Sequence, residues 1–342
     1  MTRIAVVGAG LIGRRHVDAI RRVEGAEAAC VVDPAEEAKA YAVEIGAPWR
    51  PSLQEAIADG LADAAILATP NQMHVEGGLA CVGAGLPALI EKPIADDAAA
   101  AARLVDAAEA AGVPILVGHH RRHNPIVRAA KAKIEAGALG RIVAAHAMCW
   151  FYKPDDYFNV EWRTKPGAGP IFINLIHDVD LMRHLVGEVV AVQALEASAA
   201  RGHEVEDTAA ALLHFDTGAV GTITVSDSVV APWSWELTAA ENPAYPETGQ
   251  SCYLIGGAKG SLEVPSGGVW RQDGERSWWR PIERTADRSE RIDPLDTQIA
   301  HFCEVARGEA APLVSGREGL KSLQVIEAIK RAAATGEVVR LS

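Results

Sequence analysis

The sequence predicts a two-domain α/β protein, with a doubly wound parallel sheet in the N-terminal half and a large, mostly antiparallel sheet in the C-terminal half. Up to about residue 120, short β-branched runs alternate with alanine-rich helical stretches, the pattern of βαβ units. A glycine-rich turn follows the first of these runs. Beyond residue 120, strand-like runs follow one another with few helices between them. We therefore expect domains at 1–120 and 121–342.

In the first half, predicted helices lie between the predicted strands. The strands are RIAVVG, AEAACVVD, DAAILAT, PALIEKP and VPILVG, and the helices cover 11–24, 35–46, 52–60, 71–85 and 96–112. Ser52 and Glu55 have the spacing of a capping box, and Asp96 is a candidate N-cap of the last helix.

In the second half, a helix near 125–137 is followed by a helical segment over 170–186 and then by a run of strands. The strands cover 188–200, 206–216, 218–228, 250–256 and 260–264, and two final helices cover about 295–308 and 317–334.

Composition excludes several classes of function. The formal charge of −12 argues against general affinity for nucleic acid, which requires clustered Lys and Arg. No apolar run is long enough to cross a bilayer, and the N-terminal residues lack the pattern of a signal peptide, so we expect a cytoplasmic protein. The five cysteines are scattered without a C-x-x-C pair, so neither a disulfide framework nor a metal site is predicted.

The stretch VVGAGLIG carries a dinucleotide-binding motif. Gly8, Gly10 and Gly13, with Leu11 and Ile12 between the last two, lie between a strand and a helix, where backbone N–H groups can hold a pyrophosphate. Asp33, 20 residues after Gly13, ends the second strand and can accept hydrogen bonds from ribose hydroxyls. Its charge would repel a 2′-phosphate, so we expect NAD rather than NADP.

Further motifs carry a family resemblance. They are ATPNQMH at 68–74, IEKPI at 90–94, GHHRRHNP at 118–125, EWR at 161–163 and GAGPIFINLIHDVDL at 167–181. Together with the glycine motif, they resemble the Gfo/Idh/MocA family of oxidoreductases. The resemblance implies an N-terminal Rossmann domain and a C-terminal α/β domain whose open sheet commonly forms homodimers or homotetramers. It also implies hydride transfer between a nicotinamide and a sugar, inositol or related polyol.

The resemblance assigns the site residues by matching motifs. Lys92 is similar to the family's active-site lysine, and His177 falls on its catalytic histidine. Trp162 and Arg163 resemble a pair that closes over cofactor and substrate, although they could instead pack within the second domain. The other residues placed near the cofactor are Thr69, Pro70, Asn71, His74, Glu91, Pro93 and Arg121.

One position departs from the family. Many members carry an aspartate four residues before the histidine, where this chain has Ile173. On a regular helix, Asn174 would share one side with His177 and could bind substrate. Asp180, or Asp178 if the helix begins irregularly, could orient the His177 ring.

Oxidation of an alcohol requires a base near the working pH. Free histidine titrates near 6.5 and free lysine near 10.4, so a neutral Lys92 at pH 7 needs a shift worth roughly 4.6 kcal/mol. We therefore expect His177 to be the base and Lys92 a cationic donor to the reacting oxygen. Lys92 as the direct proton acceptor remains the alternative.

The leading hypothesis is an NAD-dependent dehydrogenase acting on a hydroxyl-bearing carbon of a sugar, polyol or sugar acid. Lys153, Arg163 and Lys165 motivate the weaker prediction of a carboxylate on the substrate. The alternatives are an NAD-dependent glycoside hydrolase and a non-catalytic NAD-binding regulator on the same fold. No nucleic-acid or membrane partner is expected.

Overall fold

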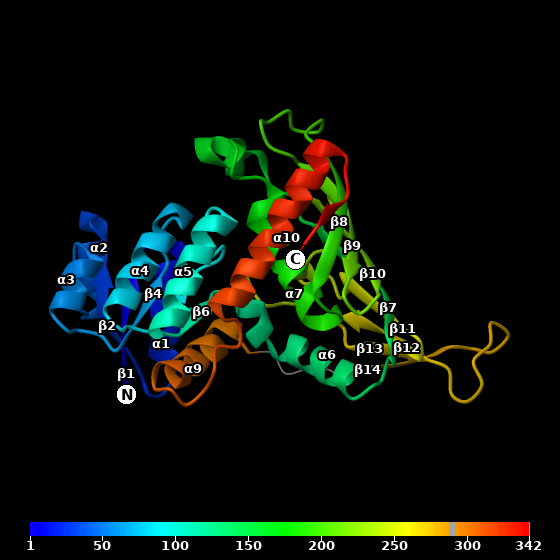
Figure 1. Ribbon diagram of the computed structural model, residues 1–342, viewed down its shortest axis with the longest axis horizontal. Helices are drawn as coiled ribbons and strands as arrows, with labels where there is room; N and C mark the ends of the chain where they lie inside the picture. The colour runs from blue at the N-terminus through cyan, green and yellow to red at the C-terminus, as the bar shows by residue number, and fades with distance from the viewer. Residues whose placement is uncertain (287–291, 342) are drawn as a thin grey trace. The chain divides into compact units, whose positions relative to one another are not determined.

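The computed structural model describes residues 1–286 and 292–341, which form two compact units. The first unit contains Met1–His123 together with Pro294–Leu323. The second contains the described residues between Asn124 and Asp293 and those from Gln324 onward. Figure 1 labels most of the helices and strands of both. None of the helices in these residues is long and apolar enough to span a bilayer.

The first unit is built on a six-stranded parallel sheet in the order β3-β2-β1-β4-β5-β6. Its strands are β1 (Thr2–Val7), β2 (Ala26–Val32), β3 (Trp49–Arg50), β4 (Ala64–Leu67), β5 (Ala88–Ile90) and β6 (Ile115–Val117). The helices between them are α1 (Leu11–Arg22), α2 (Glu36–Ile45), α3 (Leu53–Ala58), α4 (His74–Gly83) and α5 (Ala98–Ala111). β4, β5 and β6 are fully buried, which is typical of a parallel sheet covered on both faces. The doubly wound prediction is confirmed.

Local capping sets two of these helix starts. Ser52 accepts a hydrogen bond from the Glu55 N–H at 3.3 Å, as the capping-box spacing predicts. The N-cap of α5 is Asp97 and not Asp96, because the Asp97 carboxylate accepts the Ala100 N–H at 2.7 Å. An N-cap side chain accepts a hydrogen bond from a backbone N–H in the first turn, and here the residue three positions before that N–H is Asp97.

A C-terminal stretch folds with the first unit. Its helices are α9 (Pro294–Ala306) and the beginning of α10 (Gly316–Thr335). α9 buries Ile299 and Phe302 completely. The start of α10 lies directly on β6, since a Cβ at Gly319 would come within 2.6 Å of Val117. The sequence alone places residues 294–323 with the second domain, whereas their apolar contacts hold them in the first unit.

The second unit is built on a nine-stranded sheet in the order β14-β13-β12-β11-β7-β10-β9-β8-β15. Its strands are β7 (Ile142–Trp150), β8 (Val189–Ala197), β9 (Thr208–Phe215), β10 (Val220–Ser226), β11 (Tyr253–Gly257), β12 (Gly260–Val264), β13 (Gly268–Arg271), β14 (Glu283–Ala286) and β15 (Val339–Arg340). The described pairings are antiparallel except for the parallel pair β7 and β10. The prediction of a large, mostly antiparallel sheet is confirmed.

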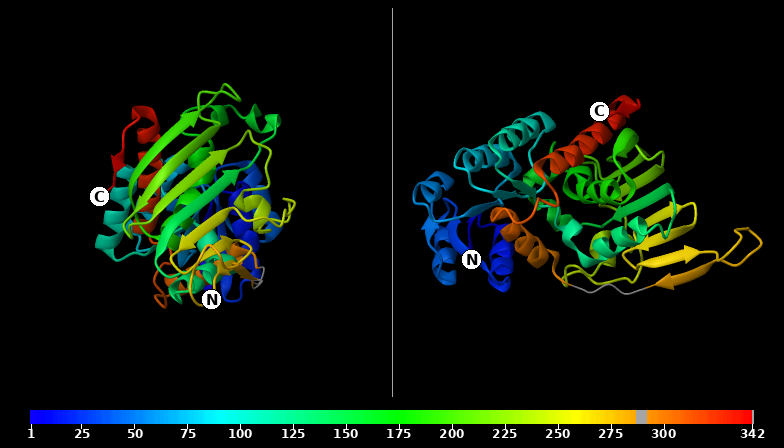
Figure 2. Two further views of the ribbon diagram at one scale, coloured as in Figure 1. Left: turned by 90° about the vertical axis from the view of Figure 1, so that its right-hand side faces the viewer. Right: turned by 60° about the horizontal axis from the view of Figure 1, so that its bottom comes forward.

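Only one face of this sheet is buried in the unit. Its helices are α6 (Pro125–Glu135), α7 (Ile176–Val186), the short α8 (Trp235–Thr238) and the second part of α10. The core between helices and sheet includes Val127, Ile176 and Ile329. Along β9, exposed and buried residues alternate, with Leu212 exposed and Leu213 buried. In the left view of Figure 2 the strands lie in front of the helices that pack behind them.

Candidate active site

The turn from β1 into α1 has room only for glycine at two positions. Gly8 has a φ of +95°, and a Cβ there would lie 2.5 Å from the Ala68 carbonyl oxygen. A Cβ at Gly13 would lie 1.9 Å from the Gly8 carbonyl oxygen. The helix therefore packs directly on the turn that precedes it, as in a dinucleotide-binding loop.

Gly10 has a different reason to be glycine. A Cβ at Gly10 would meet no atom within 4 Å, so the space above it is open. Gly10 is also the N-cap of α1, and in the described part of the chain no side chain caps this helix. The N–H groups of the first turn, which includes Leu11 and Ile12, remain available for an anion. This open cradle fits a pyrophosphate.

Asp33 follows β2 and supports the same loop. One carboxylate oxygen accepts the Ala9 N–H at 2.9 Å, and the other accepts the Ala35 N–H at 2.9 Å. Each oxygen keeps a further lone pair. The carboxylate is thus held rigidly and can still accept hydrogen bonds from ribose hydroxyls.

Two more loops lie at the carboxyl ends of the neighbouring strands. Thr69, Pro70 and Asn71 follow β4, while Glu91, Lys92 and Pro93 follow β5, with a cis peptide bond between Lys92 and Pro93. Arg121 lies in a 3₁₀ turn after β6 and is buried. The first unit therefore brings every predicted cofactor residue of its own to the strand ends where open α/β sheets bind ligands.

His74 ties two of these loops together. One ring nitrogen lies 2.8 Å from the Pro93 carbonyl oxygen and the other 2.9 Å from the Thr69 carbonyl oxygen. The ring is fully buried, and burial lowers its pKa. Its contacts tie the loop after β4 to the loop after β5.

The helix that carries His177 begins irregularly. Residues Ile171–Leu175 form a π-helical turn, and α7 starts at Ile176. The helix therefore has the irregular start that the sequence left open, with Asn174 in the π-helical turn and His177 in the regular helix. π-turns of this kind are frequent at functional sites.

Glu206 holds the start of that turn. It accepts the Ile171 N–H at 3.0 Å, and its other oxygen accepts a hydrogen bond from the Lys330 ammonium group at 2.8 Å. Gly169 makes room for it, since a Cβ there would lie 2.5 Å from a Glu206 oxygen. Sequence reasoning missed Glu206 because its contact partners are far away in the chain.

The polar residues of this helix have different surroundings. His177 is 7% exposed, and the Asn174 Oδ1 is buried without a hydrogen-bond partner among residues 1–286 and 292–341. Asp178 accepts a hydrogen bond from the Tyr253 hydroxyl and is fully buried. Asp178 is therefore engaged with the sheet beneath the helix. Ile173, at the position of the family's aspartate, is half-buried.

The loop between β7 and α7 carries the predicted closing pair. Trp162 is 56% exposed. The Arg163 guanidinium lies 4.0 Å above the Tyr157 ring and donates to the Tyr157 carbonyl oxygen at 2.8 Å. Its Nε is buried without a hydrogen-bond partner in the described residues. Arg163 is thus held in place with one donor available.

The two lysines of this region already face acids. Lys165 pairs with Glu204, and Lys153 is buried with its ammonium group 3.9 Å from Asp227. Burial lowers the pKa of Lys153 and raises that of Asp227, against their mutual attraction. Arg201 shares Asp227 at 2.8 Å and donates to the Lys153 carbonyl oxygen at 2.6 Å. This buried network anchors the loop, and no sequence motif pointed to Arg201 or Asp227.

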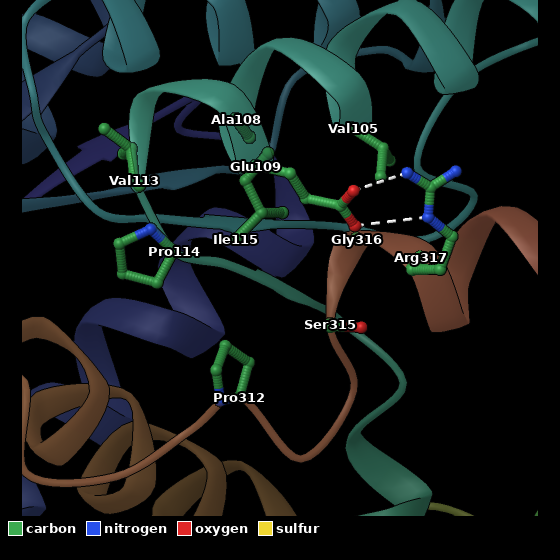
Figure 3. Close-up of a pocket in the computed structure, with 11 residues that line it drawn as sticks. Val105, Ala108, Glu109, Val113, Pro114, Ile115, Pro312, Ser315, Gly316 and Arg317 are labelled. Atoms are coloured by element: carbon green, nitrogen blue, oxygen red, sulfur yellow. Dashed lines mark hydrogen bonds and ion pairs between the residues drawn. The ribbon is translucent and has the colours of Figure 1, made fainter.

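Figure 3 shows a pocket that belongs to a different part of the first unit. It has a volume of about 230 Å³ and lies at the amino end of β6, lined by Pro114, Ile115 and the first residues of α10. Arg317 at its rim pairs with Glu109 of α5. The glycine loop lies at the opposite, carboxyl ends of the strands, so this pocket is not part of the candidate site.

Comparison with known proteins agrees with this architecture. A family described as "Oxidoreductase family, NAD-binding Rossmann fold" matches residues 2–119, and the GFO/IDH/MocA C-terminal domain matches residues 127–263. The 1,5-anhydro-D-fructose reductase of Ensifer adhaerens is 30% identical, covering 100% of this chain and 99% of the reductase. An inositol 2-dehydrogenase of Mycolicibacterium gilvum is 31% identical, over 88% of this chain and 82% of that protein.

A solved structure is similar over the same length. The WlbA dehydrogenase from Bordetella pertussis, in complex with NADH and UDP-GlcNAcA, has a TM-score of 0.82 and 29% identity, covering 100% of this chain and 98% of that one. With its cofactor loops, its two sheets and matches across both halves, the chain belongs to the Gfo/Idh/MocA family of oxidoreductases, whose N-terminal domain is an NAD-binding Rossmann fold.

Proposed function

We propose that this protein is an NAD-dependent dehydrogenase acting on a hydroxyl-bearing carbon of a sugar, an inositol or other polyol, or a sugar acid. The observation that carries the proposal is the position of Lys92. It follows β5, at the same carboxyl ends of adjacent strands where the glycine, Asp33 and Thr69 loops follow β1, β2 and β4. Relatives that cover most or all of the chain include a 1,5-anhydro-D-fructose reductase and an inositol 2-dehydrogenase. The first unit would hold the cofactor, and the second would supply His177 and Asn174 for substrate.

The cofactor residues have complementary tasks. Gly8, Gly10 and Gly13 with the N–H groups of α1 would bind the pyrophosphate, and Asp33 the adenosine ribose. Thr69, Pro70, Asn71 and Pro93, positioned by His74, would line the nicotinamide end, with Arg121, Trp162 and Arg163 completing the site. When bound, the nicotinamide supplies the acceptor or donor for hydride.

The chain's own residues handle the proton. His177 would take the hydroxyl proton of the substrate, since a histidine needs little shift to act near pH 7. Lys92 would donate a hydrogen bond to the reacting oxygen in its cationic form. The Asn174 Oδ1 is buried and available to accept a hydrogen bond from a neighbouring substrate hydroxyl. With Ile173 at the usual carboxylate position and Asp178 bonded to Tyr253, Asp180 or the substrate itself would orient His177.

A carboxylate on the substrate is a weaker part of the proposal. Lys153 and Lys165 already face Asp227 and Glu204, which leaves Arg163 as the cation with an available donor. One similar protein is described with UDP-GlcNAcA bound. We expect Arg163→Leu to weaken a sugar acid more than the matching neutral sugar.

The test is a thermal-shift screen followed by absorbance of the reduced nicotinamide at 340 nm. NAD and NADP would each be combined with inositols, aldoses, 1,5-anhydro sugars and sugar acids. The dehydrogenase proposal predicts net NADH formation with at least one compound. Release of a sugar from a glycoside without net NADH would instead identify a glycoside hydrolase, which the dehydrogenase and reductase names of the relatives do not favour. A protein that binds NAD but turns over no compound would be the non-catalytic regulator.

Asp33→Asn should reduce the preference for NADH over NADPH. A hydrogen bond to a charged group contributes about 1.5–3 kcal/mol, so we expect NADH affinity to fall roughly 10- to 100-fold while NADPH affinity falls less. Titrating both reduced cofactors by their fluorescence measures the ratio. Glu36→Gln, an exposed acid in the first turn of α2, is the matched control. An unchanged ratio of the two dissociation constants in Asp33→Asn would remove Asp33 from cofactor selection.

We also propose that the open face of the nine-stranded sheet joins copies of this chain as a homodimer or homotetramer. That face exposes apolar side chains on four adjacent strands. They are Val143 on β7, Leu212 on β9, Val220 on β10 and Leu254 on β11. Exposed apolar side chains gathered on one face of a sheet are typical of an interface. All five cysteines lie within the described residues, are buried and form no disulfide. Free cysteines of this kind suit a cytoplasmic location.

Leu212→Asp with Leu254→Asp should convert the assembly to monomers, because two buried carboxylates would lose their hydration on association. Light scattering coupled to size exclusion measures the mass. Val43→Asp on α2, which is 76% exposed, is the control and should leave the mass unchanged. A wild-type monomer at micromolar concentration would contradict the proposal.

A further inference from the structure

A buried acid lies directly beside the proposed active-site lysine. Glu91 precedes Lys92 and accepts the Lys92 N–H at 3.2 Å with one carboxylate oxygen. The other oxygen lies 2.7 Å from the His16 Nε2, on α1. His16 is fully buried and the Glu91 side chain is 9% exposed. The two groups come from helix α1 and from the loop after β5, 75 residues apart in the chain.

Glu91 leaves no room for a side chain at Gly118. A Cβ at Gly118, just after β6, would lie 2.8 Å from the Glu91 oxygen that accepts the Lys92 N–H. An ionised carboxylate only accepts hydrogen bonds, so the His16 Nε2 must carry a hydrogen and donate a hydrogen bond to Glu91. The other ring nitrogen of His16 has no hydrogen-bond partner within residues 1–286 and 292–341. The polar interaction of His16 is thus directed at Glu91.

Glu91 remains ionised despite its burial. Burial by itself would raise the pKa of Glu91, but the hydrogen bond from His16 and the charges of His16, His120 and Lys92 outweigh it and lower the pKa to about 2. His16 belongs to α1, His120 to the turn after β6, and Lys92 to the same loop as Glu91. The Glu91 carboxylate also interacts electrostatically with His74 of α4. Electrostatic interaction is reciprocal, so a fixed anion here stabilises the ammonium form of Lys92.

We propose that His16 and Glu91 are positioning residues that hold Lys92 as a hydrogen-bond-donating cation. The inference rests on the proposed function in taking Lys92 as a residue of the reaction centre. It assigns to His16, which contacts the Glu91 oxygen that does not accept the Lys92 N–H, an indirect influence on the charge of Lys92 through that carboxylate. It also favours His177 over Lys92 as the base, because a lysine beside a permanent anion gives up its proton less readily.

The test measures the titration of Lys92 without any substrate. Lysines are reductively methylated with ¹³C-formaldehyde, and the NMR signal absent in Lys92→Arg identifies Lys92. In Glu91→Gln the midpoint should fall by about one pH unit or more, the usual effect of losing a nearby opposite charge. His16→Leu should act in the same direction but by less, because a Glu91 carboxylate without its donor is no longer held in place beside Lys92. His16→Gln keeps a donor to Glu91 and should stay close to wild type.

Glu109→Gln on α5 makes the same chemical change away from Lys92 and should leave the midpoint unchanged. NADH binding and the melting temperature verify that each variant is folded. A Lys92 midpoint in Glu91→Gln equal to that of the wild type would overturn the proposal. If Glu91→Gln does not fold, equal midpoints in His16→Leu and His16→Gln would overturn it instead.

A second readout uses a substrate from the screen. Glu91→Gln should lower kcat with little change in the dissociation constant of NADH, and the alkaline limb of its pH–rate profile should move to lower pH. A purely structural role would lower the amount of active protein and leave that limb in place. Failure of every compound in the screen would count against the dehydrogenase proposal, while the Lys92 titration would still decide the role of His16 and Glu91.

Discussion

Replacing His177 with alanine is expected to lower kcat by about 10²- to 10⁴-fold, the contribution typical of a general base. NADH affinity should stay close to that of the wild type, because the loops proposed to bind the pyrophosphate and the adenosine ribose belong to the first unit and do not include His177. Single-turnover absorbance at 340 nm measures the chemical step, and NADH fluorescence titration measures binding. Added imidazole should restore part of the rate by acting as a base in the space left by the side chain.

His184→Ala is the matched control, since His184 lies on the same helix, α7, near its other end. It should retain turnover within a small factor. If His177→Ala turned over at nearly the wild-type rate while folded, His177 would be a structural histidine, and the base would have to be sought elsewhere.

Replacing Lys92 with alanine should lower kcat/KM by two orders of magnitude or more, since removing one donor to the reacting oxygen costs about 10²- to 10³-fold. Lys92→Arg separates the two candidate roles. Arginine remains cationic, so it can keep part of the activity of a hydrogen-bond donor but none of that of a base. We expect Lys92→Arg to be clearly more active than Lys92→Ala.

Lys259→Ala, in the exposed turn between β11 and β12, is the control for loss of a lysine and should leave kcat/KM unchanged. Equal loss in Lys92→Arg and Lys92→Ala, together with normal turnover in His177→Ala, would assign the proton to Lys92 and contradict our mechanism.

Much of the first unit could be predicted because its signals are local. The backbone requires glycine at position 8, since φ there is +95° and the carbonyl of Ala68 leaves no room for a Cβ. Ser52 caps its helix through a residue only three positions away. Alternation of β-branched strands with alanine-rich helices identified the parallel sheet, because each segment's pattern reflects which of its faces are buried.

The second unit was predictable in class but less so in detail. β9 could be read from its alternation of buried and exposed residues. β13 and β14 were not predicted, since they are short and four-residue runs carry little periodicity. A helix over 170–186 was predicted with either a regular or an irregular start, and the structure has the irregular one, a π-turn at Ile171–Leu175 whose Ile171 N–H donates to Glu206.

For the site, the sequence by itself determined the residue types and their order, because glycine loops and strand-end motifs are contiguous and their backbone requirements are local. Only the tertiary structure decided how those residues are supported. His16 reaches Glu91 and Tyr253 reaches Asp178 across 75 residues in each case. Residues 294–323 join the first unit instead of the second. Such contacts depend on which side chains pack against one another in the folded chain. That packing is determined by the whole sequence, and no single segment predicts it.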